Sequence, residues 1–304
     1  MRADASEEIE ADAGGGERDA GARARLRVDG GVRLRVRAED GISRAATLRE
    51  RDGYRLRTER RAGPAGGVEA LLLNTGGGVA AGDRARLEIE AGAGARVRVS
   101  SPAAERIYGA DPTADLGPAR ITVALRAEAE ARIDWLPQET ILFDRPSLER
   151  RFEIDVAPTG GALVVETLIL GRAAMGETVR TARIWDRWRA RRGGALAFAE
   201  TVRLSGAVEA ALRSRAAGGG ARAFGMALLI APDAEARLDA VRAAIGAETA
   251  PAAEQAPRML AAASAWNGML VVRALGDGAA SMRKLWARML PALSDAAPPR
   301  AWSS

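Results

Sequence analysis

Apolar and charged residues alternate along much of this chain, and this period of two constrains the fold more than any other feature of the sequence. In the segment 26–36, Val32, Leu34 and Val36 are separated by single arginines. Alternation of this kind is typical of β-strands that bury one face. The Asp-Gly-Gly sequence at 29–31 predicts a turn between two such strands.

A strand, a small-residue turn and a second strand recur three times in the middle of the chain. The three units cover residues 87–99, 121–135 and 152–166, and place Ala95, Ala131 and Ala162 at similar points. Their spacing suits a β-helical coil or a stack of hairpins that buries one continuous core. Ordinary antiparallel hairpins with chance similarity are the alternative. Both readings predict a mainly β protein.

The ends of the chain differ from this β body, which covers about 23–222. Residues 1–22 contain mostly Ala, Gly, Asp and Glu, and too few apolar groups to offset the entropy of ordering, so we predict a disordered tail. Residues 23–304 form one predicted domain. Its last part, about 223–295, has the pattern strand, helix, strand, helix.

Two helices are predicted in this last part. The first begins near Pro232 and Asp233 and ends at Gly246, because apolar residues between them recur at helical spacing. The second covers about 277–290 and ends at Pro291, since proline lacks the N–H that a helix interior needs. Apolar strands at 224–230 and 269–275 precede the two helices.

The chain contains no cysteine and no histidine. This excludes disulfides, thiolate nucleophiles, Ser-His-Asp triads and the usual zinc or nickel ligands. Residues 1–11 are acidic and polar where a secretory signal needs a basic start and an apolar run, and no stretch of about 18 apolar residues occurs. We expect a cytoplasmic protein with no membrane segment.

The sequence pI of about 10.6 reflects arginine chemistry more than a strongly basic surface. The 45 basic residues are set against 40 acidic ones, Lys284 is the one lysine, and arginine does not lose its proton in the usual pH range. Arginines also alternate with carboxylates, as at Arg84, Arg86, Glu88 and Glu90. This mixture predicts solvated strand faces and argues against a nucleic-acid partner.

The glycine-rich segment 76–83 resembles a phosphate-binding loop only superficially. Such a loop needs Lys and then Ser or Thr after its last glycine, and a helix behind it. Here Asp83 follows Gly82, and an alternating strand comes next. We predict a tight turn in which the Asp83 carboxylate accepts hydrogen bonds from amides of its own loop.

Carboxylates at two places in the chain are candidates for chemistry. Glu139 and Asp144 lie in a strand segment whose period of two points them to opposite faces unless Pro137 breaks it. They are either an acid and base pair or structural partners of arginines. Glu166 lies in an apolar strand, so it either pairs with Arg172 near Glu177 or lines a polar channel for a hard cation.

Five blocks of the sequence lie in a fixed order within about residues 30–302, and they are Leu71–Asp83, Ser101–Tyr108, Leu136–Asp144, Gly171–Glu177 and Pro299–Trp302. In this order they resemble the motifs of the UreD (UreH) family of urease accessory proteins. The third block, Leu-Pro-Gln-Glu-Thr-Ile-Leu-Phe-Asp, is the most specific. Asn74-Thr75 replaces the His-Pro pair that is usual in the family, and Ala81 replaces a glycine.

The resemblance implies a β-helical fold with two helices and no catalysis. It implies a cytoplasmic scaffold that binds apo-urease, UreF and the GTPase UreG, and that helps to deliver nickel through a polar tunnel. Ni²⁺ would pass transiently, with no permanently bound cofactor. The matching candidates for the nickel conduit are Glu139, Asp144, Glu166 and Glu177. The matching structural or interaction residues are Gly77, Gly82, Asp83, Tyr108, Pro137, Gln138, Arg172 and Gly176.

Two other functions compete with this scaffold. A carbohydrate-active β-helix enzyme would use Glu139 and Asp144 as acid and base, but the chain is only 4% aromatic and has few rings on which sugars could stack. A nucleic-acid binder is suggested only by the pI.

Overall fold

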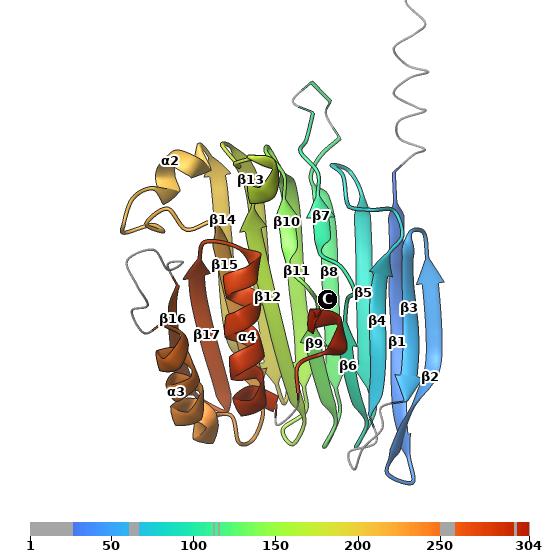
Figure 1. The fold of residues 1–304 in the computed structure, drawn as a ribbon. Coiled ribbons are helices and arrows are strands. Elements are labelled where there is room, and N and C mark those ends of the chain that lie inside the picture. The colour runs from blue at the N-terminus through green and yellow to red at the C-terminus, as the bar shows by residue number, and fades with distance from the viewer. Residues whose placement is uncertain are drawn as a thin grey trace, which may run out of the picture.

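A computed structural model describes residues 27–60, 67–111, 113–114, 116–249, 259–294 and 297–303, in which two β-sheets pack face to face (Figure 1). The protein is mainly β, as predicted. The predicted tail, 1–22, and most of the predicted connection at 249–257 lie outside the described residues. Among the described helices, none has both the length and the apolar character needed to cross a membrane.

The first sheet has seven strands in the order β14, β13, β11, β8, β5, β1, β2. Its five central strands run parallel, and the edge strands β2 and β14 pair antiparallel with their neighbours. The strands are β1 (Asp29–Glu39), β2 (Ile42–Arg51), β5 (Arg84–Ala91), β8 (Ala119–Ala127), β11 (Ser147–Val156), β13 (Ala182–Arg192) and β14 (Ala195–Gly206).

The second sheet has ten strands, and its main path runs β16, β17, β15, β12, β9, β6, β4, β3. Off this path, the short strands β7 and β10 pair with each other, and β10 also pairs with β12. The strands are β3 (Tyr54–Arg60), β4 (Val68–Asn74), β6 (Arg96–Ser100), β7 (Glu105–Ile107), β9 (Arg132–Leu136), β10 (Thr140–Leu142), β12 (Gly161–Leu170), β15 (Ala223–Ile230), β16 (Leu260–Trp266) and β17 (Met269–Gly276).

The three repeated units predicted from the sequence are successive turns of a β-helical coil. Their first strands, β5, β8 and β11, lie side by side in the first sheet, and their second strands, β6, β9 and β12, lie side by side in the second. All these pairings are parallel, which excludes antiparallel hairpins. The predicted equivalence of the three alanines is right only in part. Arg96 pairs with Arg132, and Arg132 pairs with Gly161. Ala95 and Ala131 therefore occupy equivalent positions in their turns of the coil, but the equivalent residue in the third turn is Gly160 and not Ala162.

The apolar core has two layers, one between the two sheets and one between the second sheet and the helices. Strand β12 lies between these layers and is buried on both faces. Val164 and Leu168 face the first sheet, whereas Leu163 and Val165 pack with the helices. The helices α3 (Leu238–Thr249) and α4 (Ala279–Ser294) cover the outer face of the second sheet (Figure 1). The sequence of a strand that is covered on both faces is typically a nearly continuous apolar run, and the sequence of β12 has this pattern.

The two predicted helices exist, but both predicted ends are wrong. Helix α3 continues past Gly246 to Thr249, because a glycine lowers helix stability without ending a helix. Helix α4 contains Pro291 and continues to Ser294, where Leu290 and Leu293 are buried against the sheet. The elements that were not predicted include β16, the short helix α2 (Val208–Leu212), and the 3₁₀ turns at Ala173–Met175, Glu235–Arg237 and Arg300–Ser303.

The predicted turn at residues 29–31 is also wrong, since β1 begins at Asp29. The two glycines serve close packing of neighbouring strands. A Cβ at Gly30 would lie 1.9 Å from the Asp52 carbonyl oxygen, and one at Gly31 would lie 2.0 Å from that of Arg86. Glycine within a strand often marks such a close backbone approach.

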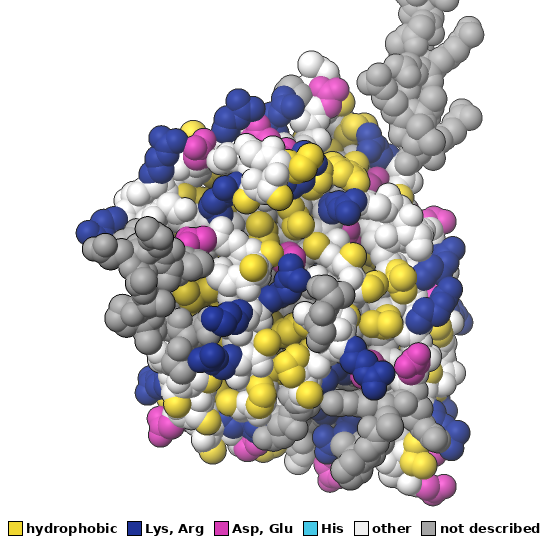
Figure 2. All heavy atoms as spheres, in the orientation of Figure 1, with side chains coloured by type: hydrophobic (Ala, Val, Ile, Leu, Met, Phe, Trp, Pro, Cys, Tyr) yellow, Lys and Arg dark blue, Asp and Glu magenta, His cyan; other side chains and the backbone are white. Residues whose placement is uncertain are grey.

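Charged side chains cover the outer face of the first sheet, as the alternating pattern predicted. Arg33 contacts Glu90 at 2.8 Å and Glu88 at 3.4 Å, and Arg86 also pairs with Glu88. On the opposite face of the molecule, Figure 2 shows basic side chains scattered among hydrophobic and acidic ones. Exposed pairs of this kind contribute little stability but keep strand faces solvated.

Truncation of Phe152 tests the packing between the sheets. Its ring is 1% exposed and stacks on Trp188 with centroids 4.1 Å apart. We expect Phe152→Ala to lower the free energy of unfolding by about 3–5 kcal/mol. Arg151→Ala, on the exposed face of the same strand, should change it by less than about 0.5 kcal/mol. Urea denaturation measures both, and equal effects would contradict this packing.

Candidate functional site: a polar cavity between the sheets

Three strands that follow one another along the chain, two in the first sheet and one in the second, each place a charged side chain among the apolar groups between the sheets. Arg150 of β11, Glu166 of β12 and Asp186 of β13 are 4%, 6% and 3% exposed. Arg150 follows Leu148 and precedes Phe152 on the inward face of β11. Charged groups are rarely buried this deeply unless they are paired.

The Arg150 guanidinium joins the two carboxylates. Its Nε and Nη2 atoms donate to the Asp186 oxygens at 3.0 and 2.7 Å, while Nη1 donates to Glu166 at 2.6 Å. Nη1 also lies 3.3 Å from the Thr140 hydroxyl, and the Trp135 indole donates to the second Glu166 oxygen at 2.8 Å. We call these five side chains the buried ion network.

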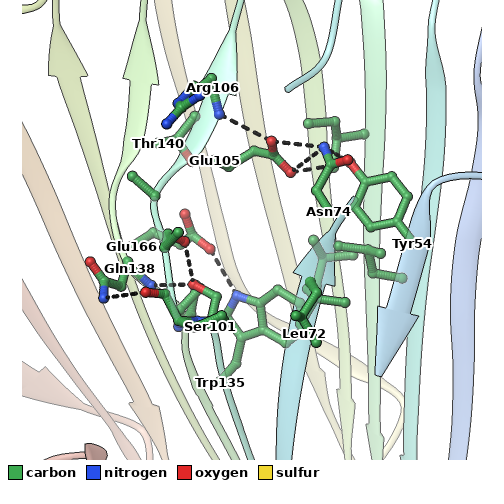
Figure 3. A pocket seen from close by; sticks show the side chains of 18 of the residues that line it. Tyr54, Leu72, Asn74, Ser101, Glu105, Arg106, Trp135, Gln138, Thr140 and Glu166 are labelled. Carbon is green, nitrogen blue, oxygen red and sulfur yellow. Dashed lines mark hydrogen bonds between the residues drawn. The ribbon is translucent and has the colours of Figure 1, made fainter. Parts of the chain in front are cut away.

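A cavity of about 250 Å³ lies against this network, and we call it the central cavity (Figure 3). Tyr54, Asn74 and Glu105 form a second polar group in its wall. The Asn74 amide donates to Glu105 at 2.9 and 3.1 Å, and the Tyr54 hydroxyl donates to it at 3.2 Å. The wall of the cavity therefore combines two carboxylates, Glu105 and Glu166, with other polar side chains and with apolar ones.

Burial shifts the protonation of both cavity carboxylates. It raises the pKa of Glu105 and of Glu166, and outweighs the hydrogen bonds that lower them. Burial alone would lower the pKa of Arg150, but the charges of Asp186 and Glu166 raise it, so the guanidinium stays protonated. Burial, followed by the charge of Glu105, also raises the pKa of Tyr54, which stays a hydrogen-bond donor.

The glycine-rich loop is a tight turn held by Asp83, as the sequence predicted, and its Gly77 lines the central cavity. Asp83 accepts hydrogen bonds from the amides of Ala80 at 2.8 Å and Val28 at 3.0 Å. Gly82 has a φ of 86°, a conformation that favours glycine. The Tyr108 hydroxyl donates to the Gly77 carbonyl oxygen at 2.8 Å, which ties this loop to β7.

The most specific motif anchors the C-terminal segment 297–303. The Gln138 side-chain amide donates to the Ala301 carbonyl oxygen at 2.7 Å, and the Trp302 indole donates to that of Leu136 at 3.2 Å. Pro137 and Gln138 also line the central cavity. The two motifs therefore meet in space, although more than half the chain separates them.

Of the four predicted conduit residues, only Glu166 lines the central cavity. Glu139 points to α4 and lies 3.4 Å from Arg283. Asp144 pairs with Arg180 at 2.7 Å, and Glu177 with Arg172 at 2.7 Å. The sequence allowed Glu166 to pair with Arg172, but its partner is Arg150.

Asp144 and Glu177 are neighbours on the surface, since the Asp144 amide lies 3.5 Å from a Glu177 oxygen. The pKa of Asp144 is lowered because hydrogen bonds from Arg180 outweigh its partial burial, and that of Glu177 is lowered by Arg172. The Arg172 guanidinium lies 4.0 Å from the centre of the Phe143 ring. Gly176, with a φ of 67°, ends the 3₁₀ turn between Arg172 and Glu177.

In the part of the chain that the structure describes, no three or more His, Cys, Asp or Glu side chains are grouped as a metal site. The central cavity instead offers scattered oxygen donors from carboxylates, hydroxyls and amides. Oxygen ligands suit hard cations and hold first-row metals weakly.

The sequence of this chain is similar to those of known proteins along most of its length. The family model described as "UreD urease accessory protein" matches residues 28–303. The chain belongs to the UreD urease accessory protein family. Among relatives named urease accessory protein UreD, that of Azorhizobium caulinodans is 43% identical over 284 residues, covering 93% of this chain and 99% of its own. The Xanthobacter autotrophicus protein is 45% identical over 280 residues, covering 92% and 91%.

Three of the five UreD motifs, 71–83, 101–108 and 136–144, contribute residues to the wall of the central cavity, but they do not contain the whole wall. Glu105, Arg150, Asp186 and Tyr54 were missed as site residues. For Arg150 and Asp186 a signal existed, because each occupies an inward position in an alternating strand. Tyr54 had none, because only the tertiary fold brings it to Glu105.

Replacement of Glu105 by glutamine tests the shifted pKa. A folded-state pKa above the ordinary value, 4.5, gives stability that is fully present below the unfolded pKa and is lost as the pH rises through the folded pKa. We therefore expect the wild-type free energy of unfolding to fall more steeply than that of Glu105→Gln as the pH rises above the ordinary pKa of 4.5. Urea titrations at a series of pH values measure both slopes. Equal slopes would show that Glu105 is not shifted.

Proposed function

We propose that this chain acts in urease maturation as a non-enzymatic scaffold of the complex that delivers nickel to apo-urease in the cytoplasm. Membership of the UreD urease accessory protein family supports an accessory role. The proposed partners are UreF, the GTPase UreG and the apo-urease subunits. We propose neither a nucleic acid nor a membrane as a partner.

The observation that carries the nickel part of this proposal is the polar central cavity between the sheets. Nickel is the cargo, not a resident cofactor, so the path needs groups that bind it weakly. Glu105 and Glu166 supply negative charge, and the neighbouring hydroxyls and amides can replace part of the hydration shell. Weak oxygen ligation lets the cation leave again.

The geometry gives the enzyme alternative no support. Glu139 contacts Arg283 of α4, whereas Asp144 contacts Arg180 before β13. An acid and base pair needs both carboxylates beside one bond of the substrate. Each of these two carboxylates has its own arginine partner on a different element.

Glu166→Gln tests the path with the smallest change of shape. It keeps the side-chain volume and removes the charge, so we expect urease activity and nickel content to fall about tenfold while the complex still assembles. Co-expression with urease, UreF and UreG, followed by co-purification and nickel analysis, measures both. Glu149→Gln, on the outer face of β11, is the matched control and should activate urease like the wild type.

A triple alanine variant at Glu139, Asp144 and Glu177 tests the other three proposed conduit residues. These side chains lie outside the wall of the central cavity, so we expect a smaller loss of activation than with Glu166→Gln, again with the complex intact. Full activation by the triple variant would remove these three from the conduit. Full activation by Glu166→Gln would remove the central cavity as the path.

A further inference from the structure

A second cavity lies on the other side of the buried ion network. This lateral cavity has a volume of about 440 Å³ and extends to the edge strands β14 and β16. Its wall includes Asp186, Trp188, Glu200 and Arg273, and otherwise mostly apolar side chains. Arg150 and Glu166 are the two residues that line both the central and the lateral cavity. Their ion pair therefore stands between the two spaces.

The buried ion network holds one cationic group and two carboxyl groups. One guanidinium faces two carboxylates, Glu166 and Asp186, at distances of 2.6–3.0 Å. Transfer of uncompensated charge into a protein interior is costly. A divalent cation between the two carboxylates would balance both of them, and the guanidinium now occupies the space that such a cation needs.

The lateral cavity also holds a polar group that lacks a partner. The Trp188 indole nitrogen is buried and donates no hydrogen bond to any described residue, although Trp188 lines this cavity. A buried donor without an acceptor is destabilising, and a water molecule, which takes about 30 Å³ of liquid, would satisfy it. The lateral cavity is large enough for several, so a hydrated cation fits its size and its chemistry.

We propose that Arg150 is an internal gate between the central and lateral cavities, and that its displacement exposes Glu166 and Asp186 as a transient site for a divalent cation. This inference rests on the proposed function, in which the cation is nickel. With the gate closed, the positive guanidinium blocks the passage and repels a cation. With the gate open, the two carboxylates bind the cation through oxygen and pass it on.

The surroundings of Arg150 allow such a movement. Its guanidinium carbon lies 5.0 Å from the centre of the Phe152 ring, and the face of an aromatic ring attracts a cation. Open volume lies on both sides of the side chain. A shift that breaks the bonds to Glu166 can therefore keep the charge partly stabilised.

The test removes the guanidinium and measures nickel binding to the isolated chain. Arg150→Met keeps a long side chain without charge, and Arg150→Lys keeps the charge but cannot hold both carboxylates at once. We expect both variants to bind Ni²⁺ in equilibrium dialysis at least about tenfold more tightly than the wild type. Arg151→Met, which removes an exposed arginine from the same strand, is the matched control and should bind like the wild type.

A triple variant, Arg150→Met with Glu166→Gln and Asp186→Asn, locates the bound ion and should return binding to the wild-type level. If Arg150→Met does not fold, Arg150→Lys decides alone. Binding no tighter than that of Arg151→Met overturns the gate. Dialysis needs no urease, so a wild-type chain that fails to activate urease would overturn the proposed function without deciding the gate.

Discussion

The hydrogen bonds of the buried Arg150 guanidinium link four strands from both sheets in the interior of the protein. They connect β11 to β13 within the first sheet and to β10 and β12 across the space between the sheets. Glu166 extends the network to Trp135 on β9. Loss of one partner from such a network leaves a buried charge uncompensated and costs about 3–5 kcal/mol. The network therefore sets the positions of the strands that surround both cavities.

The β-helical coil explains why a polar cavity can exist in this interior. Parallel strands stack in register, so inward positions of successive turns form columns that are mostly apolar. Where polar side chains interrupt these columns, the two sheets cannot close by apolar packing alone. The scarcity of aromatic side chains, 4% of the chain, also leaves few groups large enough to fill the space. The cavities lie at these interruptions.

Much of the fold could be predicted because strand periodicity is a local property. The alternating segments identified β5, β8 and β11 and their partners, and the motifs pointed to the family. Strand β16 was missed because its segment, Leu260–Trp266, consists mainly of alanine and lacks β-branched residues. Pro291 was expected to end α4, but burial of Leu293 outweighs the local cost of proline. Tertiary packing determines both the presence of β16 and the end of α4, and a local sequence pattern carries no information about that packing.

The site was less predictable than the fold. Glu166 stood out as a charge in an apolar strand, whereas Glu105 needed Tyr54 and Asn74, which lie far from it in sequence. Asp144 and Glu177 were predicted as conduit residues from motif matches, but a motif does not show which arginine a carboxylate contacts. The sequence therefore predicted the motifs near the site. Only the tertiary structure shows which carboxylates line the cavity and which lie outside it.

The most direct measurement of the central claim is anomalous X-ray diffraction at the nickel absorption edge from crystals of the chain soaked in nickel chloride. The account predicts an anomalous peak between the sheets, either beside Glu105 and Glu166 in the central cavity or between Glu166 and Asp186. It also predicts a shifted Arg150 side chain wherever nickel occupies the network. Peaks confined to surface carboxylates such as Asp144 and Glu177, with the Arg150 network unchanged, would contradict it.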